Sequence, residues 1–221
     1  MYHPGQERPS WRDSLTTVTT AQPSVVLDTA EGPAEFRRRL LAGLAEAIRE
    51  RGFRESTVAD VVRHARTSRR TFYEHFAGKQ ACFIALLQEA NAEMVRQVAA
   101  AVDPQVPWDA QVRQAIGAWI ACAQSDPAIT LSWIREISSL GDAARQVQRE
   151  LLEAFVLLVQ RLTDTPELRA AGIVPPPRPF AVMLLGGLRE LIATTVEDGG
   201  DIGDIAEIAV QATRAMLGPR G

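Results

Sequence analysis

The chain contains 221 residues, of which 46% are hydrophobic and 23% charged, and its formal net charge is −3. This composition excludes a disordered chain, and two cysteines are too few for a disulfide-stapled mini-protein. No apolar run approaches the roughly 18 to 20 residues that a membrane span needs, and residues 1–10 lack a secretory signal pattern. We therefore expect a cytoplasmic protein with no membrane partner.

Apolar periodicity divides the chain into an N-terminal arm and a helical remainder. Residues 1–33 are rich in Pro, Thr, Ser and Gln and have no sustained period, which predicts a flexible arm. From Ala34 onward, apolar residues recur at helical spacing, and the alternation of a strand is nowhere sustained. The pattern predicts an all-α fold of about nine helices.

The first four predicted helices follow from capping residues and glycines. The first helix places its apolar residues on one face and ends at Gly52. Ser56 or Thr57 caps the second, with Asp60 placed for a capping box. A short third helix runs from about residue 69 to 75, and a long fourth from 79 to about 101.

Five further helices are expected in the remaining sequence. They cover residues 108–125, the segment after Asp126-Pro127, the segment after Gly141-Asp142, the segment that follows the proline-rich connector 175–179, and residues 202–217. We divide the chain into the arm (1–33), a helix-turn-helix DNA-binding domain (34–80) and a helical effector-binding and dimerisation domain (81–221).

Residues 56–79 have the pattern of a helix-turn-helix unit, in which two short helices cross and the second presents polar groups to DNA. Apolar residues at the expected crossing are Val58, Val61, Val62, Ala65 and Phe72. Ser68, Arg69, Arg70 and Thr71 crowd the start of the second short helix, and Thr57, Tyr73 and Lys79 are candidates for phosphate contacts.

The charge distribution supports this interpretation. Residues 35–80 contain 11 Lys and Arg against 6 Asp and Glu, a net charge of +5. Residues 81–221 contain 11 against 17, a net charge of −6. A basic segment attached to an acidic one is typical of a DNA-binding domain joined to a different domain.

The segment TVADVVRHARTSRRTFYEHFAGKQACFIALL resembles the DNA-binding signature of TetR-family (tetracycline-repressor-like) transcriptional regulators. The resemblance covers roughly residues 36–87. Arg66 stands where the family usually has glycine, and Thr67 where valine is common, so the turn is the point of departure. The resemblance and the pattern together predict ten DNA-contacting residues: Thr57, Arg66, Thr67, Ser68, Arg69, Arg70, Thr71, Tyr73, His75 and Lys79.

The resemblance implies that the remaining helices bind an effector and form a dimer. By helix position, the expected pocket wall comprises Ile116, Trp119, Ile120, Trp133, Ile137, Phe155 and Met183, with Arg135, Glu136 and Arg189 as polar candidates. The expected dimer interface comprises Leu184, Gly187, Leu188, Leu191, Ile205, Ile208 and Ala212. For each of these residues, ordinary core packing is the alternative.

The prediction is a homodimeric repressor that a small, largely apolar effector releases from a palindromic operator in double-stranded DNA. Two alternatives stay open: an activator or effector-independent regulator of the same family, and an enzyme or ligand carrier built on a helical bundle. The sequence contains no catalytic constellation, and Cys82 and Cys122 lack metal-ligand spacing, so we expect no enzyme activity, no metal and no cofactor.

Overall fold

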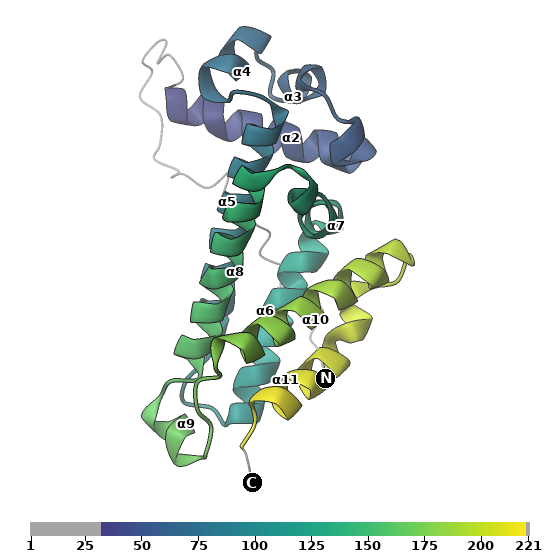
Figure 1. The fold of residues 1–221 in the computed structure, drawn as a ribbon. Helices are drawn as coiled ribbons and strands as arrows, with labels where there is room; N and C mark the ends of the chain where they lie inside the picture. Colours follow the sequence, from purple (N-terminus) through teal and green to yellow (C-terminus); the bar gives the residue numbers. More distant parts are fainter. Residues whose placement is uncertain (1–31, 220–221) are drawn as a thin grey trace, which may run out of the picture. The chain divides into compact units, whose positions relative to one another are not determined.

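The computed structural model describes residues 32–219. Within that range the chain forms ten α-helices and two short 3₁₀ helices, and contains no strand (Figure 1). The predicted all-α fold is confirmed. The predicted flexible arm lies outside the described residues, apart from Gly32 and Pro33.

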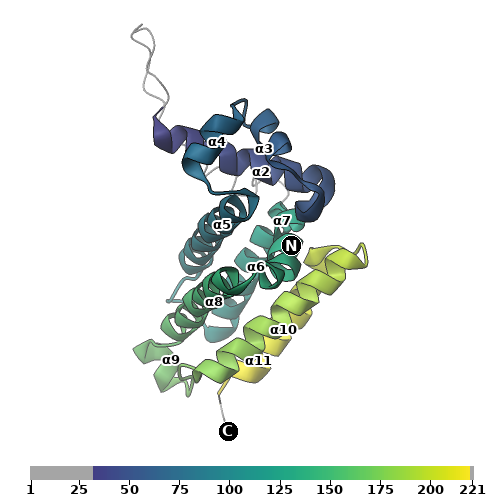
Figure 2. The same cartoon turned by 45° about the horizontal axis from the view of Figure 1, so that its top comes forward.

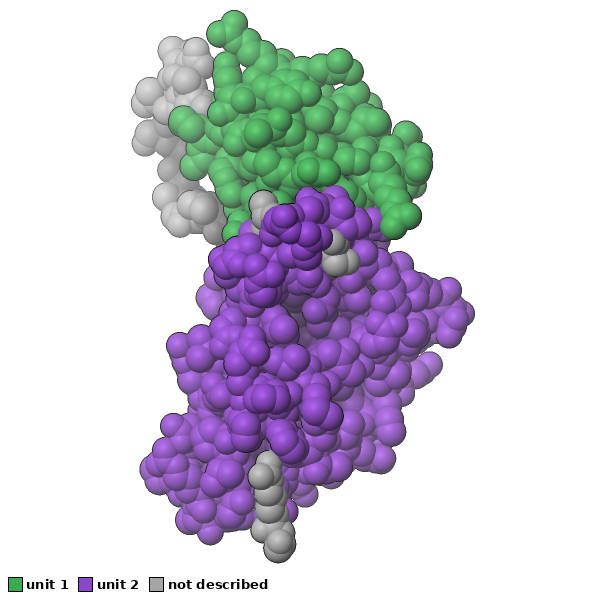
Figure 3. Space-filling view, viewed as in Figure 1, with its two compact units in different colours: residues 1–89 green, residues 90–221 purple. Residues whose placement is uncertain are grey.

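The chain divides into two compact units, residues 1–89 and 90–221, which Figure 3 colours separately. The boundary lies within α5 (Lys79–Ala101), whereas the sequence analysis placed a domain boundary at the start of that helix. Unit 1 also contains α2 (Pro33–Glu55), α3 (Val58–His64) and α4 (Arg69–His75).

Unit 1 has a closed apolar core. Gly52, at φ 77°, breaks α2 where the sequence predicts its end. The residues that follow bring Phe53 back onto α5, where its ring stacks on Phe83 with centroids 4.0 Å apart. The largest fully buried side chains of this unit are Leu40, Leu41, Leu44, Ile48, Val61, Phe72, Phe83, Leu86 and Leu87.

Helices α2 and α3 approach each other closely at Gly43. A β-carbon at this position would lie 2.6 Å from the carbonyl oxygen of Val61 and 3.0 Å from the backbone nitrogen of Ala65. Because real side chains do not tolerate such distances, only glycine fits. The contact fixes the position of α3 relative to α2.

Unit 2 is a helical bundle whose central packing involves α10. This helix packs against α7, α8 and α11, and α6 packs against α11. Figures 1 and 2 show α10 and α11 side by side. The elements are α6 (Trp108–Ser125), α7 (Pro127–Glu136), η1 (Ile137–Ser139), α8 (Asp142–Leu162), α9 (Pro166–Ala170), α10 (Arg178–Glu197), η2 (Ile202–Ile205) and α11 (Ala206–Leu217).

Helix α9 is not among the helices predicted from the sequence. Thr165 caps this helix by accepting a hydrogen bond from the backbone nitrogen of Leu168, and Pro166 opens it. The capping signal is therefore present in the sequence. Five residues are too few to show a helical period, so the pattern does not predict the helix.

By length and composition, α10 could cross a membrane, since an 18-residue window reaches a mean hydropathy of 1.4. The expectation that no apolar run has this length therefore does not hold for α10. However, Leu184, Leu185, Leu188 and Ile192 are buried against other helices of the bundle, and a core helix passes the same test. This packing buries 33% of the window and explains part of its hydropathy.

Candidate DNA-binding and effector sites

Thr57 starts α3 with a complete capping box. Its hydroxyl accepts a hydrogen bond from the Asp60 backbone nitrogen at 3.2 Å, and its backbone nitrogen donates to Asp60 Oδ2 at 2.9 Å. The Thr57 hydroxyl also donates to Asp60 Oδ2, and these bonds lower the pKa of Asp60 below its ordinary value. The predicted cap is confirmed, and Thr57 stays exposed beside it.

The turn between α3 and α4 contains the departure from the family pattern. Arg66 has φ 49°, the only positive φ among the described non-glycine residues. The left-handed conformation that the family's glycine suggested is thus present, and an arginine adopts it. The guanidinium of Arg39 on α2 stabilises this turn, because it donates to the carbonyl oxygens of Ala65 at 2.6 Å and Arg66 at 2.8 Å.

The sequence reasoning missed Arg39. It is one of three consecutive arginines, Arg37, Arg38 and Arg39, and residue type alone does not show which of them reaches α3. The structure assigns each a different partner: Arg37 pairs with Glu89, Arg38 with Glu35, and Arg39 with the turn.

Helix α4 presents its polar residues to solvent. Phe72 points into the core and is fully buried, which directs Arg69, Arg70 and Tyr73 outward. The Arg70 side chain is 90% exposed and that of Tyr73 59%. Ser68 caps the helix by accepting from the Thr71 backbone nitrogen at 3.1 Å. An exposed basic helix held by one buried aromatic residue suits insertion into a DNA groove.

Three of the other predicted contact residues are less accessible. Thr67 and Thr71 are half-buried, and the Thr71 hydroxyl lies 3.0 Å from that of Ser68. His75 is also half-buried and packs beside Phe76. Together with the exposed residues, they form one continuous segment from the turn through α4.

Lys79 has an intramolecular role. Its ammonium group donates to the carbonyl oxygens of Phe53 and Ser56, each at 2.7 Å, and to that of Arg54 at 3.1 Å. The nitrogen also lies 4.4 Å from the centroid of the Phe53 ring. The three hydrogens of the ammonium group thus have acceptors at the end of α2. The phosphate contact predicted for Lys79 would have to compete with these bonds.

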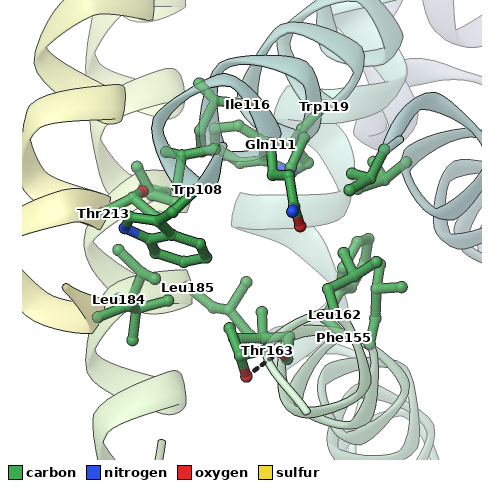
Figure 4. Close-up of a pocket in the computed structure, with 18 residues that line it drawn as sticks. Trp108, Gln111, Ile116, Trp119, Phe155, Leu162, Thr163, Leu184, Leu185 and Thr213 are labelled. Carbon is green, nitrogen blue, oxygen red and sulfur yellow. Dashed lines mark hydrogen bonds between the residues drawn. The ribbon is translucent and has the colours of Figure 1, made fainter. Parts of the chain in front are cut away.

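Unit 2 contains an apolar cavity of about 90 Å³, partly open to solvent, between α6, α8, α10 and α11 (Figure 4). Trp108, Ile116 and Trp119 form the α6 side of this cavity, and Leu184 and Leu185 the α10 side. The hydroxyls of Thr163 and Thr213 donate to carbonyls of their own helices. The cavity therefore offers an apolar surface with few free polar groups, which suits a largely apolar ligand.

A smaller cavity of about 20 Å³ adjoins the first, and the two share Trp119, Phe155 and Leu185. Its lining includes Trp133 and Arg189. The Arg189 guanidinium lies over the Trp133 ring, 5.7 Å from the centroid, and burial lowers the pKa of Arg189. The buried Nε atom of Arg189 and the indole nitrogen of Trp133 have no hydrogen-bond partner among the described residues.

The predicted pocket wall is brought together in part. Ile116, Trp119 and Phe155 line the larger cavity, and Trp133 lines the smaller one. Ile120 and Ile137 are buried but line neither cavity. Met183 is 66% exposed and lines neither cavity, so the structure does not place it in the wall.

Two of the three polar candidates, Arg135 and Arg189, differ in whether their donors are already hydrogen-bonded within the chain. Arg135 donates hydrogen bonds to both Glu190 and Glu197, which raise its pKa and lower theirs. Arg189 makes no such ion pair. The third candidate, Glu136, is half-buried at the end of α7.

The predicted dimer residues separate into two groups. Leu184, Leu188 and Ile205 are buried within unit 2, and the two leucines line the larger cavity, so these three side chains offer little surface to a partner. The others lie at the surface or partly so: Gly187, Leu191, Ile208 and Ala212. Phe180 and Met183 join them as exposed apolar residues of α10.

Neither cysteine has the environment of a reactive thiol. Burial raises the pKa of Cys82 to about 12 and that of Cys122 to about 11. At neutral pH both therefore stay protonated and are poor nucleophiles. No group of three or more His, Cys, Asp or Glu residues that could hold a metal occurs among residues 32–219.

Comparisons with known proteins agree with this geometry. The family described as "Bacterial regulatory proteins, tetR family" matches residues 40–86, the segment from α2 to the first part of α5. No curated protein matches the chain in sequence.

Solved structures of similar fold cover most of the chain. The fatty acid degradation regulator FadR from Bacillus halodurans is 16% identical with a TM-score of 0.69, and the match covers 82% of this chain and 98% of that one. FadR from Bacillus subtilis, solved in complex with stearoyl-CoA, is also 16% identical with a TM-score of 0.69. That match covers 83% of this chain and 98% of FadR. A regulatory protein of the tetR family from Rhodococcus RHA1 is 14% identical with a TM-score of 0.65. That match covers 85% of this chain and 99% of the other.

At these identities the structural matches show a common fold, and the family match covers the exposed α4 and the turn before it. The chain is therefore similar to the tetR family of bacterial regulatory proteins over residues 40–86, and it shares the fold of solved structures from that family.

Proposed function

We propose that the protein is a homodimeric transcriptional repressor that leaves a palindromic operator when a small, largely apolar effector binds unit 2. One observation carries the proposal: unit 1 exposes a basic helix, α4, while unit 2 contains an apolar cavity. The same chain thus combines a surface for DNA with an interior space for a ligand.

DNA contact is assigned to the turn and α4. Arg69 and Arg70 point about 100° apart around the helix, so one faces base edges while the other contacts phosphate. The surrounding predicted residues supply further phosphate and base contacts. Lys79 acts by holding the end of α2 against α5, because its hydrogens are engaged there.

Dimerisation is assigned to the exposed face of α10 and α11. Phe180, Met183 and Ile208 expose apolar side chains on these adjacent helices. A β-carbon on Gly186 or Gly187 would meet no atom within 4 Å, so a partner helix has room to approach there. Two helices from each subunit would make a four-helix bundle about a two-fold axis, and this symmetry implies a palindromic operator.

Release follows from differential affinity. An effector that binds more tightly to the conformation with the wrong spacing between the two DNA-binding units shifts the population toward that conformation. The FadR structure with stearoyl-CoA supports the proposal, because a protein of this fold binds a ligand with an apolar chain. We place the protein in the cytoplasm and assign it no enzymatic step.

The DNA-binding part is tested by mobility shift with the DNA upstream of the protein's own gene, at physiological salt. We expect a specific complex that survives excess unrelated DNA. A deletion strain with a reporter on the bound promoter then distinguishes repressor from activator by the sign of the change. Complexes that unrelated DNA competes away equally would refute the proposal.

The dimer is tested with Met183→Glu, which places a charge on the exposed face of α10. We expect a dimer for the wild type and a monomer for the variant by light scattering, since an interface excludes an unpaired charge. Leu157→Glu on α8 is the matched control, because Leu157 is also exposed, at 42%, but lies outside the proposed face. A monomeric wild type, or a variant that stays dimeric, would contradict the assigned interface.

A further inference from the structure

We propose that the effector is an amphiphilic anion: a single carboxylate that binds Arg189, attached to an apolar chain that fills the larger cavity of unit 2. This inference rests on the proposed function and adds the chemical class of its ligand. It begins from one unusual group, a buried arginine nitrogen without an acceptor.

The first argument is the unsatisfied charge. Arginine is always protonated in proteins, and burying a charged donor without an acceptor is costly, so such groups are normally hydrogen-bonded. The Nε atom of Arg189 is buried without a partner among the described residues, and burial opposes the charged form of this side chain. An anionic acceptor at this position would remove the penalty.

The second argument is that the neighbouring carboxylates are already engaged. Glu190 follows Arg189 in sequence, but both of its carboxylate oxygens accept hydrogen bonds from Arg135, at 2.8 and 2.9 Å. Glu197 is held by the same guanidinium at 2.7 and 2.8 Å. Both acids are thus hydrogen-bonded to Arg135, so Glu190 acts on Arg189 only through its charge, and the Nε atom of Arg189 has no acceptor among the described residues.

The third argument is the donor set around Arg189. The indole nitrogen of Trp133 is also buried without a partner and lines the same small cavity. Gln148 of α8 lines that cavity as well. An arginine and an indole N–H are both donors, and two donors that line one cavity without an acceptor match the oxygens of a carboxylate. A cation or a pure hydrogen-bond donor would find no counterpart in this pair.

The fourth argument is the shape of the adjoining space. The small cavity, at about 20 Å³, has room for little more than one water-sized group, for which roughly 10–15 Å³ suffices. Trp119, Phe155 and Leu185 line both this cavity and the larger apolar one, so the two cavities are neighbours. A ligand whose head group is small and charged, and whose remainder is apolar, fits this sequence of spaces.

The test compares decanoate with decanamide, which have the same chain but differ in charge. Binding is followed by quenching of tryptophan fluorescence, because Trp108, Trp119 and Trp133 line the two cavities. We expect the wild type to bind decanoate at least about tenfold more tightly than decanamide. Shortening the chain to octanoate should weaken binding by roughly fourfold per methylene.

Arg189→Met keeps the length and apolar volume of the side chain but removes its charge. We expect this variant to bind the acid and the amide equally. Arg178→Met is the matched control: Arg178 is exposed on the same helix and pairs with Glu153, so its loss should leave the preference unchanged. Trp133→Phe, which removes the second donor, should reduce the preference without abolishing it.

If Arg189→Met does not fold, the wild type and Arg189→Lys are used to test the inference by their preference for decanoate over decanamide. Arg189→Lys keeps the positive charge but lacks the planar set of donors. Equal binding of acid and amide by the wild type, no binding of either, or a preference that survives Arg189→Met would overturn the inference.

Operator binding is measured on the same samples to separate this inference from the proposed function. If the protein binds the operator but does not bind decanoate, and decanoate does not change the operator complex, only the carboxylate assignment is refuted. Selective decanoate binding by a protein that forms no operator complex refutes only the proposed function.

Discussion

The two units of the molecule differ in whether their polar side chains have hydrogen-bond acceptors. In unit 1, Arg39 and Lys79 direct their charges to backbone carbonyls that the ends of α2 and α3 leave free. In unit 2, Trp133 and Arg189 bury nitrogens that have no acceptor among the described residues. Every buried side-chain nitrogen or oxygen without a hydrogen-bond partner within residues 32–219 belongs to unit 2.

This difference matches the two functions proposed for the units, DNA binding for unit 1 and ligand binding for unit 2. A DNA-reading helix must be held in one geometry, and unit 1 achieves this with satisfied caps and a closed core. A ligand-binding bundle must leave space and unpaired donors for its ligand, at a cost in stability when it is empty. The predictions below test this contrast, from the largest expected effect to the smallest.

The largest effect is expected for Arg69→Ala combined with Arg70→Ala. Specific DNA affinity should fall at least about 100-fold, since one arginine contact to a base is worth about 1–3 kcal/mol and a phosphate contact is lost with it. Fluorescence anisotropy with the upstream duplex measures this loss. The melting temperature should hardly change, because both side chains are exposed. Undiminished specificity would mean that α4 is not the reading helix.

A methyl group added at a glycine should have opposite effects in the two units. Gly43→Ala should destabilise the protein by about 1–3 kcal/mol, because the new β-carbon meets the carbonyl of Val61. Gly117→Ala, on α6 in open space, should stabilise it by about 0.5–1 kcal/mol through helix propensity. Denaturant unfolding compares the two. Equal responses would show that α2 and α3 can separate at little cost.

The turn at Arg66 is expected to carry strain of about 1 kcal/mol, since its φ of 49° is unfavourable for a residue with a side chain. Arg66→Gly and Arg66→Ala both remove the guanidinium, but only glycine relieves the strain. The glycine variant should therefore be more stable than the alanine variant by about 1 kcal/mol in chemical unfolding. An alanine variant of equal or greater stability would indicate a relaxed turn.

Filling the cavity of unit 2 should cost little stability but abolish ligand binding. Ala115 lines the larger cavity, so Ala115→Leu places new apolar atoms into existing space. We expect an unfolding free energy within about 1 kcal/mol of the wild type. Decanoate should no longer quench the tryptophan fluorescence. A severe loss of stability would show that the space closes in solution.

The smallest effect concerns pH. Hydrogen bonds from Arg135 lower the pKa of Glu190 and Glu197 below their ordinary value of 4.5. Their stabilising contribution is therefore present above pH 4.5 and is lost as the pH falls through the lowered pKa values. Melting temperatures between pH 7 and 3 should fall less steeply for Arg135→Gln than for the wild type. Arg145→Gln, which breaks an exposed pair with Asp142, should keep the wild-type slope.

Local signals predicted the DNA-binding unit well. The caps at Thr57 and Ser68 and the break at Gly52 follow from interactions within a few residues of the chain. Arg39 was not singled out from the sequence, and Lys79 was predicted to contact phosphate. Both side chains donate to backbone carbonyls 26 residues away in sequence. No local pattern identifies a partner at that separation.

The faces of α10 were harder to predict for a different reason. Apolar residues occur on most sides of this helix, so periodicity does not show which side faces inward. Leu184 and Leu188 were expected at the dimer interface, but they line the larger cavity; Met183 was expected in the pocket, but it is exposed. Only the packing of α10 against α7, α8 and α11 decides between the faces.

The division of tasks between the units is tested most directly by backbone amide hydrogen exchange, measured on the wild-type protein with and without operator DNA. We predict slower exchange on DNA binding in residues 66–75, the turn and α4, and no comparable protection in residues 108–119 of α6. Decanoate should produce the opposite pattern, with protection in α6 and α10. Protection by DNA that appears in α6 and α10, or that spares α4, would contradict the account.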